Sequence, residues 1–478
     1  MRVGVPDPSL TGFSGVAAVA ELVDRLDVVG RLDRGIGSIK SRDRGASAGE
    51  LLVAMAQSQL LGADALVGLD RQRVDVGVSE LSAVPVLAST TAAGLARRFG
   101  PRQLAGVEAA VADLTGRAVA VLPPARRAGL ASAVTVDLDS TDVEVYGSKK
   151  QGVAYNYAGQ RAGRPHLGTW AEAGLSMAAE LLAGNQDVRP RAAGLLRRAL
   201  AGIPEDVRAQ ARARDRLRVR ADSGYFTADL AHAALEQGAD FAVAAKRNTA
   251  MWRAYAGIPE QAWAPAQRMS GAQVAAVDYA PAGWPPGTYT IVRRVRIDAD
   301  TISLDPRSRR RRTIEAGQLA LALEGAATHA YAVSFIVTNI PANDRPPDTD
   351  TDTDTGPAAG VETITGLEAW FRRRTDIEDR IREAKLGAGL AHLPSGHHGV
   401  NTVWMWAALL AGNLSVLLQA LTLIDTHGRA HGARLRHDLL CVPARLSRHG
   451  RQLTLRLPPG RELLPQVLAR LRALPTTA

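Results

Sequence analysis

The chain has 478 residues, of which 46% are hydrophobic and 22% charged, and it carries a formal net charge of +10. This length and composition are typical of a globular protein with roughly two to three domains. The positive surplus favours a polyanionic partner, with nucleic acid as the first candidate and a GC-rich coding bias as the alternative. The single cysteine, Cys441, excludes an internal disulfide and a cysteine-based zinc site.

The N-terminal segment MRVGVPDPSLTGFSG lacks the apolar stretch of a signal peptide. No segment reaches the roughly 18 uninterrupted apolar residues of a membrane-spanning helix. We therefore expect a cytoplasmic, nucleoid-associated protein without a membrane partner.

Residues 1–130 are expected to form a mostly helical N-terminal domain. Apolar residues recur at helical spacing in residues 15–32 and again in residues 48–61. A modestly basic helical domain suits either DNA binding or packing and dimerisation, and its sequence does not separate the two.

Residues 131–250 have the pattern of the first part of an α/β core. The run AVTVDLDST predicts a strand whose polar end presents Asp139, with Asp137 on the same strand face. After two further strands and a helical stretch, LRVRADSGYFT predicts a strand that ends at Asp222, and a helix then leads to a strand that ends at Lys246. This order is typical of parallel crossover geometry, in which ligands gather at the carboxyl ends of strands.

Residues 251–330 are interpreted as a β-rich insertion. TYTIVRRVRID alternates as a strand, and ISLDPRSRRRRTIE predicts a strand, a turn and a second strand, with tip arginines that are either solvated or in contact with phosphate. AYAVSFIVTNI is expected to rejoin the main sheet, and PANDRPPDTDTDTDTGPAAG to form a disordered surface loop. Residues 331–425 then complete the core, and residues 426–478 form a basic region suited to DNA or dimer contacts.

The segment WFRRRTDIEDRIREAK, residues 370–385, predicts one continuous helix. Phe371, Arg374, Glu378 and Lys385 are separated by three, four and seven residues, which places them on one helix face. A carboxylate between two cations suits a surface that holds a metal ion and an anionic polymer. The same pattern also occurs on solvated amphipathic helices.

Three acidic residues thus occupy positions that suit a metal site: Asp139 and Asp222 at strand ends, and Glu378 on the helix after the insertion. If the sheet and the helix bring the three carboxylates together, their mutual repulsion has to be offset by cations. An all-oxygen site suits Mg²⁺ or Mn²⁺, and two such ions activate a water or a 3′-hydroxyl against a phosphodiester.

These motifs carry a family resemblance. DLDST, RADSGYF and FRRRTDIEDRIREAK resemble the DDE transposases of bacterial insertion sequences, and the last resembles the Tyr-x2-Arg-x3-Glu-x6-Lys signature of the branch with a β-rich insertion. Arg374, Glu378 and Lys385 fit the signature at every spacing, whereas Phe371 takes the tyrosine position without its hydroxyl. The resemblance implies an α/β fold: a ribonuclease-H-like catalytic core, interrupted by the β-rich insertion and preceded by the mostly helical domain.

The resemblance also implies a function. A protein of this kind is a DNA transposase that binds the terminal inverted repeats of its insertion sequence and catalyses metal-dependent DNA cleavage and strand transfer. Its partners would be double-stranded DNA, as transposon ends and target, and a second copy of the chain in a homodimeric synaptic complex. Asp139, Asp222 and Glu378 would be catalytic and would hold two Mg²⁺ or Mn²⁺ ions.

The expected DNA contacts are Phe371, Arg374 and Lys385 from the signature and Lys246 from its strand end. An aromatic residue of the insertion is implied to hold a flipped base. The candidates for that role are Trp252, Trp263 and Trp284. Two alternatives stay open: a ribonuclease-H-like DNA nuclease that does not join strands, and a catalytically silent DNA-binding derivative.

Overall fold

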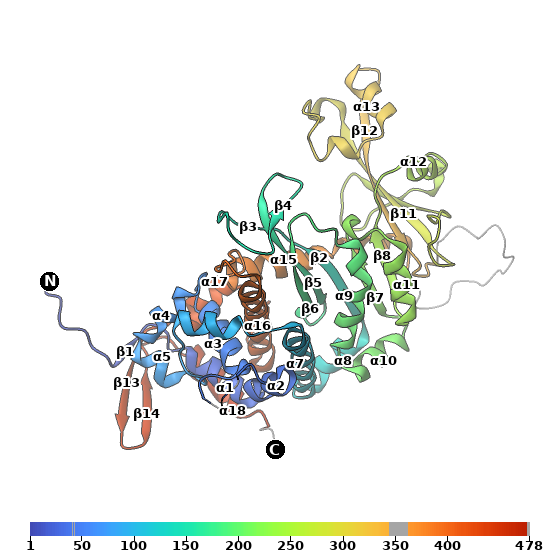
Figure 1. The fold of residues 1–478 in the computed structure, drawn as a ribbon. Helices are drawn as coiled ribbons and strands as arrows, with labels where there is room; N and C mark the ends of the chain where they lie inside the picture. Colours follow the sequence, from blue (N-terminus) through green and yellow to red (C-terminus); the bar gives the residue numbers. More distant parts are fainter. Residues whose placement is uncertain (41, 43, 344–361, 476–478) are drawn as a thin grey trace.

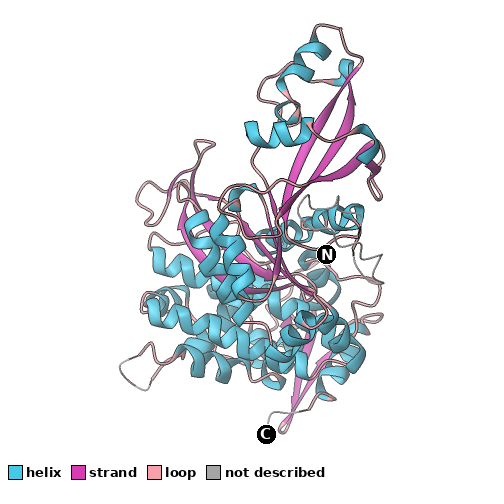
Figure 2. Ribbon diagram, turned by 90° about the vertical axis from the view of Figure 1, so that its right-hand side faces the viewer, coloured by secondary structure: helices cyan, strands magenta, loops and turns pink. Residues whose placement is uncertain are grey.

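The computed structural model describes residues 1–40, 42, 44–343 and 362–475. A long twisted sheet runs through the molecule, with a β-rich arm at one end and a helical part at the other (Figures 1 and 2). The acidic loop predicted from the sequence falls mostly in residues 344–361, outside the described residues.

The core of the sheet begins as an antiparallel meander. β2 (Val134–Ser140) pairs with β5 (Arg161–Trp170), and β5 pairs with β6 (Leu175–Ala183). On its other side, β2 pairs in parallel with β7 (Leu217–Ala221), which pairs in parallel with β8 (Asp240–Ala244). This strand order confirms the predicted ribonuclease-H-like α/β core. Two short strands also pair with β5: β3 (Val143–Glu144) and β4 (Ala154–Tyr155).

The strands of the insertion extend the core sheet. β12 (His329–Thr338) pairs antiparallel with β8, so the prediction that this segment rejoins the sheet is confirmed. β11 (Tyr289–Asp298), β10 (Ala272–Val277) and β9 (Ala264–Pro265) follow in order beyond β12 and form the arm in Figure 1. The arm also carries the helices α12 (Thr249–Ala256), η2 (Glu260–Ala262) and α13 (Ala316–Leu323).

The strand, turn and strand predicted for residues 302–315 are wrong. This segment follows the short helix η3 (Ala299–Thr301) and consists mainly of turns and the short helix η4 (Arg311–Thr313). Only Ile314 of the segment bridges to the sheet, at Ala332. The guanidinium of Arg311 donates to two carbonyl groups of the same segment, those of Ser303 and Leu304. These local bonds close a compact loop and take up backbone acceptors that a strand would need for its ladder.

Helices cover both faces of the core sheet (Figure 1). α9 (Arg189–Ala201), α10 (Glu205–Arg212) and α11 (Ala228–Glu236) lie on one face, and α15 (Thr375–Arg382) and α16 (His398–Thr422) lie on the other. α9 approaches β5 so closely that a Cβ at Gly168 would come within 2.7 Å of the Ala199 side chain.

The first and last parts of the chain pack together. β1 (Leu10–Thr11) pairs with β13 (Ala444–His449), and α18 (Leu463–Arg472) packs on α1. The N-terminal helices are α1 (Val16–Arg25), α2 (Val28–Ile36), α3 (Ala48–Leu60), α4 (Val67–Arg73), α5 (Val76–Leu81), α6 (Ser89–Ala96), α7 (Pro101–Ala120) and α8 (Pro124–Ser132). The remaining C-terminal elements are α17 (Gly432–Leu435), η6 (Arg436–Leu440) and β14 (Gln452–Arg456). The domain boundaries at residues 130 and 425 stay predictions.

α16 connects this helical part to the sheet. It packs against α3 on one side and β6 on the other, and Asn413 exchanges hydrogen bonds with the backbone of Ser176 in β6. α16 has the length and apolar composition of a membrane-spanning helix, but 83% of its most apolar window is buried inside the protein. It is therefore the central core helix.

Candidate active site

The register of the sheet brings Asp139 and Asp222 together. Leu138 of β2 lies opposite Ala221 of β7 in a parallel pair, and each aspartate is the next residue along its strand. Both side chains therefore lie at the carboxyl edge of the sheet, where ligands gather in α/β folds. Asp139 accepts a hydrogen bond from the backbone N–H of Ser140 at 2.7 Å, and Asp222 accepts one from Gly224 at 2.8 Å.

Arg374 links the third acidic residue to this edge. Its guanidinium lies 3.3 Å from Oδ2 of Asp139 and 3.5 Å from Oε1 of Glu378. Arg374 is 17% exposed and Asp139 14%, whereas Glu378 is 58% exposed. The structure thus gathers the three predicted catalytic residues in one place, with an arginine between two of them.

The helix that carries Glu378 is not continuous, contrary to the sequence prediction. α14 (Ile364–Arg372) ends before Arg374, α15 begins after it, and a π-helical turn, η5 (Glu383–Gly387), follows α15. At the break, the N–H of Arg373 bonds to the carbonyl of Trp370 instead of continuing the α-helical ladder. That carbonyl also accepts a 2.6 Å hydrogen bond from Arg220, and a side chain inserted at the ladder is a known cause of such kinks.

Arg220 is held beneath the break by a buried ion pair with Asp137. Its Nε and Nη2 lie 2.7 and 2.8 Å from the two carboxylate oxygens, and the side chains are only 3% and 1% exposed. The guanidinium also lies 5.0 Å from the centre of the Trp370 ring. Asp137 and Asp139 share one face of β2, so the strand that carries Asp139 also anchors the α14–α15 junction.

The charges of Asp222 and Glu378 both act on Asp139. Burial raises the pKa of Asp139 to about 6, the Arg374 guanidinium opposes the increase, and the charges of Asp222 and Glu378 add to it. Burial also raises the pKa of Tyr225 well above its ordinary value, and the charges of Asp139 and Asp222 raise it further. Tyr225 therefore stays protonated behind the two aspartates, with its ring 5.5 Å from that of the buried His166.

A groove of about 680 Å³ opens beside Arg374, between the core and the insertion. Asp222 lines this groove, together with Phe371, Arg374 and Lys246, three of the four residues predicted to contact DNA. The other cations that line this groove are Arg247, Arg293, Arg309, Arg312 and Arg372. Burial lowers the pKa of Arg247, and the charges of Arg309 and Arg312 lower it further, as expected where cations crowd together.

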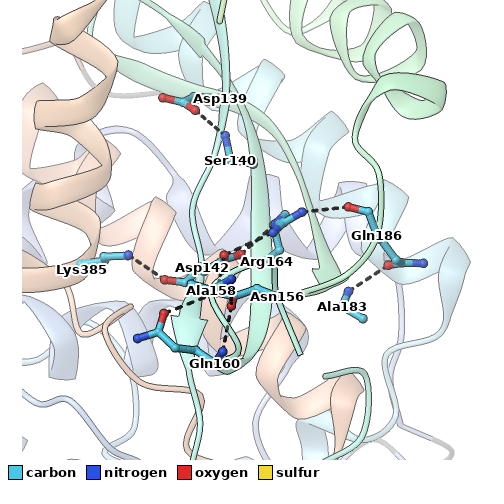
Figure 3. A network of polar contacts seen from close by, with 10 residues as sticks. All are labelled: Asp139, Ser140, Asp142, Asn156, Ala158, Gln160, Arg164, Ala183, Gln186 and Lys385. Carbon is cyan, nitrogen blue, oxygen red and sulfur yellow. Dashed lines mark hydrogen bonds and ion pairs between the residues drawn. The ribbon is translucent and has the colours of Figure 1, made fainter. Parts of the chain in front are cut away.

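Lys385, the fourth predicted DNA contact, lies apart from this groove. Its Nζ donates to the backbone carbonyl of Asp142 at 2.8 Å, in a polar network below the end of β2 (Figure 3). Asp142 in turn accepts from Arg164 at 2.8 Å and from Asn156 at 2.8 Å. Burial lowers the pKa of Lys385, and the Asp142 charge opposes that decrease.

The tryptophans proposed to hold a flipped base all pack against other rings or cations. Trp252 contacts Phe335 edge to face, at 5.4 Å between ring centres. The Arg294 guanidinium lies 4.2 Å from the centre of the Trp263 ring. Trp284 packs against Phe226 and Phe241. Each ring therefore has a structural role, and a base-holding role for any of them stays a prediction.

The donor chemistry of the acidic cluster fits a divalent cation. Asp139, Asp222 and Glu378 offer only carboxylate oxygens, the ligands that Mg²⁺ and Mn²⁺ prefer. Within the described residues, no three carboxylate, histidine or cysteine side chains are close enough to hold an ion as they stand. The guanidinium of Arg374 lies between Asp139 and Glu378 and supplies positive charge there, as a metal ion would.

Comparison with known proteins identifies the family. The model of the transposase DDE domain group 1 family matches residues 8–303 and 326–476. Among solved structures, a piggyBac transposase synaptic complex with hairpin DNA, determined by cryo-EM, matches with a TM-score of 0.41 and 8% identity, over 88% of this chain and 78% of that chain. No curated protein sequence matches. Because the family model spans most of the chain, the protein belongs to the transposase DDE domain group 1 family.

Proposed function

We propose that this protein is the DNA transposase of a bacterial insertion sequence. It binds the terminal inverted repeats of its element, cleaves the DNA there with the help of divalent metal ions, and transfers the strand ends to target DNA as a homodimer. The observation that carries the proposal is the position of Asp139 and Asp222 at the carboxyl edge of the sheet, with Glu378 linked to Asp139 through Arg374, beside the groove lined by arginines.

Each part of the site has a chemical task in this proposal. Asp139, Asp222 and Glu378 would hold two Mg²⁺ or Mn²⁺ ions, whose charge would activate an attacking water or 3′-hydroxyl and stabilise the leaving oxygen. The cations of the groove bind the phosphates of the strand to be cut and align it with the carboxylates. The buried pair of Asp137 and Arg220 holds the α14–α15 junction, so that Glu378 stays within reach of the two aspartates.

Arg374 compensates the carboxylates when no metal is bound. Three carboxylates in one place repel one another, and the guanidinium contact with Asp139 and Glu378 offsets part of that repulsion. Arg374 also lines the groove, so the same side chain would be available to a DNA phosphate if a metal ion neutralised the carboxylates in its place.

A strand-transfer assay tests the proposal. Purified protein is incubated with a labelled duplex that ends in the terminal repeat of the element, a target plasmid and Mg²⁺. Asp222→Asn should abolish both cleavage and joining but leave end binding largely intact. The matched control is Asp229→Asn, because Asp229 is an exposed aspartate of α11 and should keep full activity.

The products separate the alternatives. Joined products that depend on Mg²⁺ and on Asp222 support the transposase, whereas products limited to nicks support a nuclease. Binding of the terminal repeat without any cleavage by the wild-type chain would indicate a catalytically silent derivative. Cleavage that persists in Asp222→Asn would overturn the assignment of the site.

A further inference from the structure

The C-terminal hairpin of β13 and β14 is unusually basic. Residues 439–461 contain no aspartate or glutamate, and residues 444–461 contain Arg445, Arg448, Arg451, Arg456 and Arg461. The hairpin projects from the helical part as a two-stranded ribbon, at the opposite end of the molecule from the insertion (Figure 1). β14 is the edge strand of its sheet, since the strand order is β1-β13-β14.

The two faces of the hairpin differ sharply in chemistry. Register pairs Leu446 with Leu455, and these leucines face the protein. Leu446 lies against Gly77 of α5, where an added Cβ would come within 3.0 Å of the leucine side chain, and Leu455 packs on the main core. The opposite face consists of polar and cationic pairs: Arg445 with Arg456, Ser447 with Thr454 and His449 with Gln452.

Along β14 the side chains of the polar face are more exposed than those of the leucine face. Gln452, Thr454 and Arg456 are exposed, whereas Leu453 and Leu455 between them are partly buried. The polar face is therefore turned to solvent by the packing of the leucines, and its side chains are held in a fixed array by the strand pairing.

Two arginines directly opposite each other on this face are unfavourable for the isolated protein. Like charges at directly paired positions destabilise a sheet. Arg445 has one acidic neighbour, Asp7 at 3.2 Å, in a surface pair that contributes little. Within the described part of the chain, no carboxylate lies within ion-pair distance of Arg456. Charge on an edge strand can serve to prevent aggregation, but that purpose does not require two arginines in one cross-strand pair.

We infer that the polar face of this hairpin is a second DNA-binding surface, which contacts the phosphate backbone of double-stranded DNA. The inference rests on the proposed function, because DNA is then the polyanion that the protein meets. Arg445 and Arg456 receive one phosphate between them, and Ser447, Thr454 and Gln452 donate hydrogen bonds to neighbouring phosphate oxygens. A two-stranded ribbon is also narrow enough to follow a groove of duplex DNA.

The test measures binding of a fluorescent mixed-sequence duplex by anisotropy at increasing KCl. The variant is Arg445→Gln/Arg456→Gln in the full chain. The matched control is Arg197→Gln/Arg214→Gln, which removes the same charge from two exposed residues. Arg197 lies on α9 and Arg214 follows α10, both on the core sheet and away from the hairpin. The hairpin variant should bind the duplex roughly tenfold to a hundredfold more weakly near 0.1 M salt. The slope of log affinity against log salt concentration should become shallower by the equivalent of about two phosphate contacts. Its melting temperature should not fall, because the substitution removes a repulsive pair.

The outcomes distinguish this inference from the proposed function. If the wild-type chain binds no duplex DNA, the proposed function fails together with the inference. If the wild-type chain binds and the hairpin variant shows the same salt dependence as the control variant, the hairpin inference alone is overturned. A change in oligomeric state by light scattering, with DNA binding unaltered, would overturn it in favour of contact with a second copy of the chain.

Discussion

Replacing Asp139 with asparagine should stabilise the folded protein at neutral pH while it abolishes DNA cleavage. Asparagine has nearly the shape of a protonated aspartic acid and removes the charge that burial disfavours at this position. In the folded chain the pKa of Asp139 is about 6, compared with 3.8 for an aspartate in water. The carboxylate is therefore kept at a cost in stability, as is common for groups retained for activity.

The magnitude follows from these two pKa values. Because the pKa is raised on folding, the folded state binds the proton more tightly than the unfolded state. Asp139 thus contributes most stability below pH 3.8, and that contribution is lost as the pH rises towards and through about 6. With about 1.4 kcal/mol per pKa unit, the asparagine variant should be more stable than the wild type by roughly 3 kcal/mol at pH 8 and by only about 0.5 kcal/mol at pH 4.

The assay is equilibrium urea unfolding of both proteins between about pH 4 and pH 8, followed by tryptophan fluorescence. Other titrating groups are shared by the two proteins, so they cancel in the difference. Added Mg²⁺ should narrow the gap at pH 8, because the metal stabilises the wild-type carboxylate cluster more than the variant. A difference that does not change with pH, or a variant that is less stable at pH 8, would refute the reasoning, because contact with Arg374 would then outweigh burial.

Three further predictions concern the cations around the site. Arg220→Met should destabilise the protein by roughly 3–5 kcal/mol in urea unfolding, because it leaves Asp137 buried without a partner, and adding Asp137→Leu should restore much of the loss. Arg374→Gln should tighten Mg²⁺ binding by up to about tenfold in calorimetry, since the guanidinium no longer competes for the carboxylates; unchanged affinity would contradict its place between them. Lys385→Met should speed amide hydrogen exchange around the β2–β3 connection and leave the slope of log affinity for DNA against log salt concentration unchanged. A slope made shallower by the equivalent of about one phosphate contact would instead support the DNA contact expected from the sequence.

The sequence by itself identified the candidate site residues and the type of the elements that carry them. Asp139 and Asp222 could be placed at strand ends because a strand, its polar end and the turn that follows are local features of the chain. The spacing of Arg374, Glu378 and Lys385 is likewise local, so the family signature was readable without a structure. The return of residues 329–338 to the main sheet was also predicted correctly, since a long apolar strand needs partners on both sides.

Tertiary contacts decided the features that depend on residues far apart in the sequence. The helix expected over residues 370–385 is broken because Arg220, some 150 residues earlier, reaches the carbonyl of Trp370. Helix propensity is a local property and cannot show such a contact. A helix can break despite good propensity when a buried side chain donates to a backbone carbonyl that the helix would use. The same holds for Lys385, whose contact with the Asp142 carbonyl depends on how η5 packs against the core.

Strand register was likewise beyond the sequence. Whether Arg445 faces Arg456 or a leucine depends on a shift of one residue, which moves every side chain to the other face of the ribbon. Strand register also places Asp139 beside Asp222. The two aspartates lie next to each other because Leu138 pairs with Ala221, the residue before each of them. Local pattern therefore determined which residues are candidates for the chemistry, and the packing of distant segments determined which of them lie close together.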